Sequence, residues 1–202
     1  MCEYARDEVL LAPPDWAVCS RSYAVGVVAL VPDNIPGELK SLDRWCLWRY
    51  EEDDSGRISK PPYQARAPSL RAWPNDPDTW APFWQALNAH NTTRRSDGIA
   101  IALEPDLGIL GIDLDYLDRW TDRDQPWDIV RTINSYTELS PSLNGYRIFC
   151  YADMPEGRRV RDFVQLSNQR IFTVTGNTLN VSRHLEHRQA QVDEVHHVFL
   201  GT

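Results

Sequence analysis

Two carboxylates one residue apart are the side chains whose type and spacing point most directly to chemistry. Asp113 and Asp115 lie in the apolar stretch Gly111-Ile112-Asp113-Leu114-Asp115. In a β-strand, side chains at i and i+2 leave the same face, so we expect the two acids side by side. Carboxylates that close repel each other unless a cation lies between them. Because Mg²⁺ is often bound by one or two carboxylates plus substrate phosphates, the motif favours metal-dependent phosphoryl chemistry. The alternative is a strand that runs out into an acidic loop.

Composition and charge limit the classes of protein to which this chain can belong. The chain has 202 residues, 42% of them hydrophobic, enough for one large or two small domains. The net charge of −8 argues against a large duplex-binding surface but leaves room for a local basic groove. The four cysteines are scattered, which predicts free thiols in a reducing cytoplasm. The longest apolar stretch, 23–31, is too short to span a bilayer, so we expect a cytoplasmic protein without a membrane segment.

Short strands and helices alternate in an order that predicts an α+β fold. The expected strands are 24–31, 45–50, 98–103, 108–116, 136–139, 146–151, 162–166 and 170–175. We expect 98–103 to pair with 108–116 as one hairpin, and 162–166 with 170–175 as a second. Residues 1–34 form an extension of unknown role, and 35–202 form the domain.

Helices are expected as a short turn at 37–42, from Asp76-Pro77 onward, over 126–134, and from 182. Asp76 is the expected N-cap of the second, with Pro77 in its first turn. Aromatic residues follow at helical spacing from Trp80 to Trp84, and this stripe is expected to face the core. Lys60-Pro61-Pro62-Tyr63 reads as an edge segment, because proline cannot donate to a strand ladder.

Several segments follow one another in the order of one known family. They are 35–39 with 45–48, Lys60-Pro61-Pro62-Tyr63, Asp76-Pro77-Asp78-Thr79-Trp80, Asp97-Gly98-Ile99-Ala100 leading into 111–115, 135–142, and 170–177. The chain from about 35 to 200 thereby resembles the primase-polymerase domain of phage and plasmid replication proteins, within the archaeo-eukaryotic primase superfamily. The resemblance implies a catalytic core with an RRM-like antiparallel sheet, hairpins and flanking helices.

The resemblance also implies an activity and a set of ligands. Such enzymes join nucleotides by in-line phosphoryl transfer assisted by two divalent metals, here Mg²⁺ or Mn²⁺. It makes Asp113 and Asp115 the catalytic metal ligands and implies nucleotide triphosphates, a single-stranded or primed DNA template and a replicative helicase as partners. The residues that it implies for nucleotide or template phosphates are Lys60, Ser142, Arg147 and Arg170. A solvated surface lysine is the alternative for Lys60, and a salt bridge to a neighbouring acid is the alternative for Arg170.

The second motif departs from the family pattern at two positions. Arg147 stands where the family has a histidine that holds the triphosphate. Arginine still binds phosphate through its planar, permanently charged fork, but it does not titrate near neutral pH. Leu143 replaces a turn glycine, so we expect different backbone angles in this loop.

The third motif lacks the acid that would complete the metal site. Val164 or, with a one-residue gap, Gln165 occupies its place, and Asp162 is the nearest acid that a register shift could bring in as a metal ligand. Losing one carboxylate of a two-metal site lowers the rate by on the order of a thousandfold or more. Two hypotheses follow, an active primase-polymerase or a degenerate nucleic-acid- or partner-binding module. An acid facing Asp113 favours the first, and Val164 or Gln165 in that place favours the second.

Overall fold

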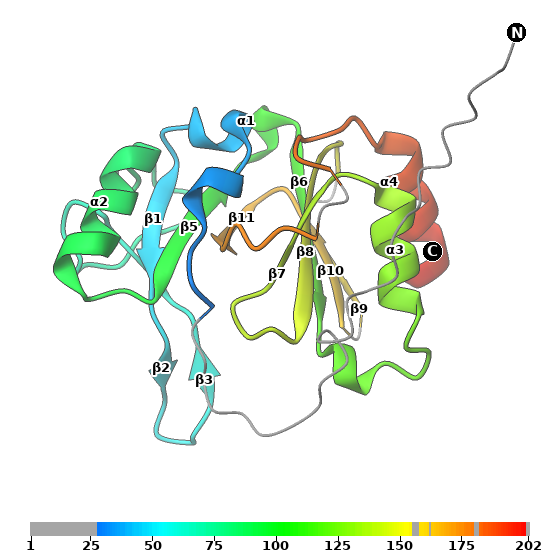
Figure 1. Ribbon diagram of the computed structural model, residues 1–202, viewed down its shortest axis with the longest axis horizontal. Coiled ribbons are helices and arrows are strands. Elements are labelled where there is room, and N and C mark those ends of the chain that lie inside the picture. The colour runs from blue at the N-terminus through cyan, green and yellow to red at the C-terminus, as the bar shows by residue number, and fades with distance from the viewer. Residues whose placement is uncertain (1–27, 155–157, 162, 180–181, 201–202) are drawn as a thin grey trace, which may run out of the picture.

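The computed structural model describes residues 28–154, 158–161, 163–179 and 182–200, which form an α+β fold with antiparallel sheets, as predicted (Figure 1). The strand predicted over 24–31 lies partly outside these ranges, and 28–31 form no strand. The described residues before 35 nevertheless contact the domain. The Val31 N–H donates to the Thr175 carbonyl at 2.8 Å. Within the described ranges, we find no helix long and apolar enough to cross a membrane.

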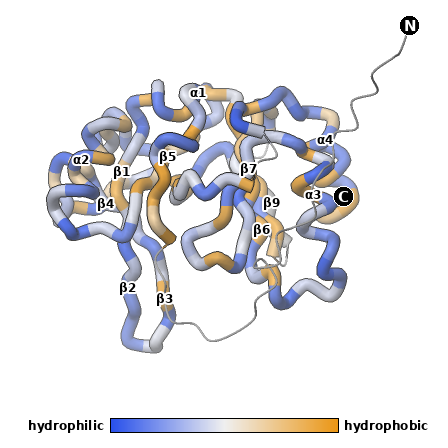
Figure 2. Tube along the Cα trace, in the orientation of Figure 1, coloured by the Kyte–Doolittle hydropathy of each residue, from blue (hydrophilic) through white to orange (hydrophobic). Residues whose placement is uncertain are grey.

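The first sheet has four strands in the order β11-β5-β1-β4, and each neighbouring pair is antiparallel. The bounds are β1 Trp45–Trp48, β4 Pro62–Tyr63, β5 Gly98–Leu103 and β11 Arg170–Val174. β4 lies at the edge, as its prolines predict. A separate ribbon pairs β2 Glu51–Glu52 with β3 Ile58–Ser59. Figure 2 shows β1 and β5 as largely apolar, whereas the tip of this ribbon is hydrophilic.

The second sheet has five strands in the order β7-β8-β6-β10-β9. The bounds are β6 Ile109–Asp115, β7 Tyr136–Leu139, β8 Gly145–Tyr151, β9 Arg158–Arg161 and β10 Val164–Ser167. Its pairs are also antiparallel. The basic run 158–161 forms β9, a strand paired with β10.

Helices lie at both ends of the molecule, with the two sheets between them (Figure 1). These are α2 Phe83–Thr93 at one end and, at the other, α3 Gln125–Ile133 and α4 Gln189–Val195, which continues into a π-helical turn at His196–Leu200. The short helix α1 Gly37–Lys40 lies between the two ends. Single 3₁₀ turns occur at Pro32–Asn34, Pro77–Thr79, Pro105–Leu107 and Leu117–Arg119. In Figure 1, α2 lies beside β1, and α3 and α4 lie at the opposite end, next to the five-stranded sheet.

The alternation of side chains along β6 determines which face of the sheet its two carboxylates share. Ile112 and Leu114 are fully buried in the core that this sheet shares with α3 and α4. Gly111 lies on the other face, where a Cβ atom would be 2.5 Å from the ring of Phe172 on β11. Asp113 and Asp115 share the face of Gly111, so both carboxylates face the four-stranded sheet.

Both predicted hairpins are wrong. β5 and β6 belong to different sheets, because β1 and β11 take both edges of β5. The 3₁₀ turn at Pro105–Leu107 and the left-handed Gly108 (φ 57°) redirect the chain between β5 and β6. β10 and β11 are likewise in different sheets, and the short turn between them carries the chain from one sheet to the other.

The second and last helices begin later than predicted. The Asp76 side chain accepts the Asp78 N–H at 3.2 Å, but it caps only a 3₁₀ turn. Ala81 then pairs with Trp45, with both N–H···O bonds at 2.8 Å, and this bridge delays α2 until Phe83. Trp84 is 67% exposed, so the aromatic stripe does not lie wholly in the core. The last helix, α4, begins at Gln189 instead of near 182.

Candidate functional site

Four strands of the second sheet carry a line of polar side chains across one face. Glu138 on β7 pairs with Arg147 on β8, Arg147 pairs with Asp113 on β6, and Asp113 pairs with Gln165 on β10. Directly opposed residues of an antiparallel sheet project from the same face. These four residues, called here the polar row, therefore all face the four-stranded sheet.

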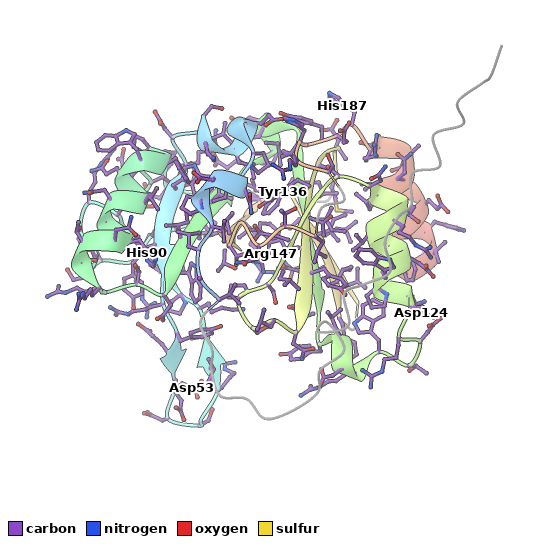
Figure 3. All side chains as sticks on the ribbon, viewed as in Figure 1. Asp53, His90, Asp124, Tyr136, Arg147 and His187 are labelled. Carbon is purple, nitrogen blue, oxygen red and sulfur yellow. The ribbon has the colours of Figure 1, made fainter. Side chains whose placement is uncertain are left out.

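Arg147 is the centre of the polar row and joins the two sheets (Figure 3). Arg147 is only 4% exposed. Its Nε donates to Asp113 Oδ1 at 2.6 Å, and its Nη1 donates to the Thr173 carbonyl at 2.5 Å and to the Thr173 hydroxyl. A buried guanidinium is tolerated only when it is paired and hydrogen-bonded, as here. The residue predicted to hold a triphosphate thus contacts Asp113 and the edge of β11.

Glu138 is a buried acid of the site that sequence reasoning missed. It accepts the N–H groups of Thr175 and Gly176, each at 2.9 Å, and the Tyr136 hydroxyl at 2.8 Å. Burial raises its pKa, and the positive charge of Arg147 opposes that shift. The sequence offered one signal for it. Glu138 is the one charged residue of the short segment 136–139, whose other residues suit a buried strand.

Gly176 is what allows the main chain to approach Glu138. Its φ is 69°, in the left-handed region, and a Cβ atom there would lie 2.1 Å from the Val31 carbonyl oxygen. Only glycine accommodates both the angle and the contact. The two consecutive N–H groups that bind Glu138 therefore depend on this residue.

Asp115 and Lys60 complete the charged cluster beside the polar row. Asp115 lies one same-face step from Asp113 and is half-buried. Burial and the charge of Asp113 raise the pKa of Asp115. Burial and the charge of Arg147 lower the pKa of Lys60, whereas the charges of Asp115 and Asp113 raise it. The structure thus brings the predicted residue Lys60 near both aspartates.

Arg170 also reaches this cluster, and Ser142 lies in an exposed turn. Arg170 Nη1 is 3.7 Å from Asp113 Oδ2, and the Arg170 side chain is 43% exposed. Ser142 is hydrogen-bonded to Ser140 at 3.1 Å in the turn between β7 and β8. Leu143 in this turn has φ 60°, so it adopts the left-handed angles of a glycine instead of the different angles expected. This conformation costs a non-glycine residue roughly 1–2 kcal/mol.

The strand register places Val164 and Gln165 on opposite faces of the five-stranded sheet. Val164 pairs with Leu114 and is buried in the core under α3 and α4. Gln165 pairs with Asp113, and its Nε2 is buried without a hydrogen-bond partner among the described residues. Of the two positions expected for a third acid, Gln165 is therefore the one that lies opposite Asp113. Asp162, the predicted alternative ligand, lies outside the described residues.

The described side chains do not fit a two-metal site. In the described ranges, no group of three or more His, Cys, Asp or Glu side chains could hold a metal ion. Asp113 Oδ1 accepts a hydrogen bond from Arg147, and Asp113 Oδ2 faces Arg170, so a divalent cation would compete with two guanidinium groups. Three acids and three cationic side chains meet here, which leaves little net negative charge to attract a metal.

No family model matches the chain, and no curated protein matches its sequence.

Chemically, the cluster combines a buried ion pair, Asp113 with Arg147, and two more accessible cations, Lys60 and Arg170. Cations at the edge of such a cluster bind anionic oxygens, phosphate above all.

The raised pKa of Asp115 predicts how its replacement changes stability with pH. The pKa of this carboxyl group is higher in the folded chain than its value of about 3.9 in the unfolded chain. The folded state therefore loses stability as the pH rises from the unfolded pKa to the folded pKa. Asp115→Asn removes this effect. We expect its free energy of unfolding, relative to the native chain, to increase from pH 4 to pH 7 in urea titrations. Asp128→Asn, at an exposed ion pair, is the control. The same pH profile for both variants would contradict the prediction.

Proposed function

We propose that this chain is a cytoplasmic primase-polymerase-like module that binds the phosphates of a nucleotide or of single-stranded DNA and has lost most metal-dependent nucleotidyl transfer. The observation that carries the proposal is Gln165 opposite Asp113, with Arg147 bound to the same carboxylate. A neutral amide stands where the transfer reaction requires an anionic ligand. The guanidinium already neutralises one of the two remaining acids.

The ordered motifs and the antiparallel α+β architecture support the primase-like part of the proposal. The five-stranded sheet has helices on one face and the charged cluster on the other, an arrangement compatible with an RRM-like core. Five residues singled out from the sequence lie in that one cluster: Lys60, Asp113, Asp115, Arg147 and Arg170.

The charges support phosphate binding over a short length of nucleic acid. Arg170 and Lys60 are the cations of the cluster with most access to solvent, because Arg147 is buried. A chain with a net charge of −8 repels a long polyanion. We therefore expect weak, salt-dependent binding through few phosphate contacts.

Fluorescence anisotropy with a labelled oligothymidylate tests the binding. Arg170→Ala should weaken binding about tenfold and lower the slope of log affinity against log salt by about 1. Arg57→Ala, at the exposed tip of the β2–β3 ribbon, should change neither quantity. Equal affinity and slope for the native chain and Arg170→Ala would reject a phosphate contact at this cluster.

Primer extension with Mg²⁺ or Mn²⁺ tests the loss of transfer. We expect no measurable extension by the native chain. The second candidate function, an active nucleotidyltransferase, is favoured by one observation, the two aspartates on one strand face beside Lys60. Extension by the native chain that disappears in Asp115→Asn would establish that activity instead.

A further inference from the structure

A second cationic site lies where β1 ends and β5 begins. A pocket of about 410 Å³ is lined there by residues from the end of β1, the loop before α2 and the turn after α2. The Asp97 N–H donates to the Trp48 carbonyl at 2.8 Å, and Asp97 Oδ2 accepts the Tyr50 N–H at 2.6 Å. These bonds fix two walls of the pocket relative to each other.

The charge of this pocket is mainly positive. Arg49, Arg94 and Arg95 line it with a single acid, Asp97. Arg49 is already paired, because its Nε donates to Glu51 at 2.9 Å and its guanidinium lies over the Tyr63 ring. Arg94 and Arg95 are exposed, and their side chains have no hydrogen bond or ion pair within the part of the chain that the structure describes.

The backbone at Arg94 closes the helix in a conformation that is strained for any residue other than glycine. Arg94 ends α2 with φ 51° and ψ 29°, the left-handed conformation usually occupied by glycine or asparagine. A strained non-glycine residue at the rim of a pocket is a reason to look for a function. Ser96, two residues later, is held by a 2.9 Å contact with His90 Nδ1, so the turn that presents both arginines is anchored to α2.

From this geometry we infer that the pocket binds a phosphate group through Arg94 and Arg95. Two unpaired guanidinium forks at one rim suit a phosphate with several anionic oxygens. The Tyr50 side chain, which packs edge-on against Trp48, gives the pocket an aromatic wall for the organic part of a phosphoester. The site is separate from the polar row. In Figure 3, His90 beside the pocket and Arg147 in the polar row lie well apart.

Isothermal titration of the full chain at low salt with inorganic phosphate, a deoxynucleoside monophosphate and an oligothymidylate tests this site. Arg94→Gly is the informative variant, because it removes one guanidinium and also relieves the left-handed strain. We expect Arg94→Gly and Arg95→Ala each to weaken phosphate binding about tenfold, without a loss of thermal stability for Arg94→Gly. Arg57→Ala is the matched control, with an exposed arginine outside the pocket.

The three probes also distinguish the source of the phosphate. Tighter binding of the monophosphate than of inorganic phosphate would assign the site to a nucleotide, and tighter binding of the oligomer would assign it to a nucleic-acid backbone. Unchanged affinity for all three probes in the Arg94→Gly/Arg95→Ala double variant, or no binding by the native chain, would overturn the inference. A role of Arg94 only at the helix C-terminus predicts lower stability with unchanged phosphate binding, which would also overturn it. Arg170→Ala leaves this pocket intact, so failure here is distinguishable from failure at the polar row.

Discussion

Replacing Arg147 with alanine is expected to lower the free energy of unfolding by about 3–5 kcal/mol, a large share of the stability of a domain this size. The Arg147 guanidinium is buried and contacts Asp113 and the edge of β11, and its charge also acts on the buried Glu138. Without it, two acids would remain in the interior with less compensation. Leaving a buried charge unpaired costs much more than losing the pair itself.

Urea unfolding followed by circular dichroism measures this loss. The matched control is Arg131→Ala, which removes an exposed ion pair with Asp128 and should cost less than about 1 kcal/mol. A similar small loss for both variants would mean that Arg147 does not stabilise the polar row.

The second large effect is expected from Gln165→Glu, which adds a carboxylate directly opposite Asp113 with almost no change in shape. With Asp113 and Asp115, the new carboxylate makes three neighbouring acids, which offer the oxygen ligands that Mn²⁺ and Mg²⁺ prefer. We expect the variant to bind Mn²⁺ at least about tenfold more tightly than the native chain. At a Mn²⁺ concentration of about 100 times the dissociation constant, the bound ion should stabilise the variant by roughly 2.7 kcal/mol.

Calorimetric titration with Mn²⁺ and thermal unfolding with and without the ion measure both quantities. Gln169→Glu is the control, because it adds the same charge in an exposed turn four residues away along the chain. If the two variants bind Mn²⁺ with equal affinity, Gln165 does not stand at the position of a third metal ligand. A gain confined to Gln165→Glu would support the degenerate site and leave the phosphate pocket at Arg94 untouched.

The sequence predicted individual elements well where local pattern determines them. The strands β5, β6, β7 and β8 and the helix α3 lie within a few residues of their predicted bounds. Each carries an apolar periodicity or a turn signal that acts within its own segment. The expectation that Asp113 and Asp115 share a face is confirmed for the same reason, because it follows from alternation alone.

Strand partners and buried polar contacts could not be predicted in the same way. A short connection suggested that β5 pairs with β6, but β5 finds its partners in β1 and β11. Glu138 was missed because the N–H groups that bind it belong to Thr175 and Gly176. The ion pair between Arg147 and Asp113 depends on the register of two strands, which no motif specifies. The start of α2 depends on a bridge between Ala81 and Trp45 that is likewise not local.

The divergence of β5 and β6 has a consequence for how the chain folds. β5 is complete as a sheet strand only after β11 has arrived, since Leu103 pairs with Arg170. Contacts between residues so distant in sequence are formed late and slowly, because loop closure must precede them. Arg147 reaches Thr173 only at that stage, so the contact that joins the charged cluster to β11 forms only then. The charged cluster is therefore completed by a long-range closure of the chain between β5 and β11.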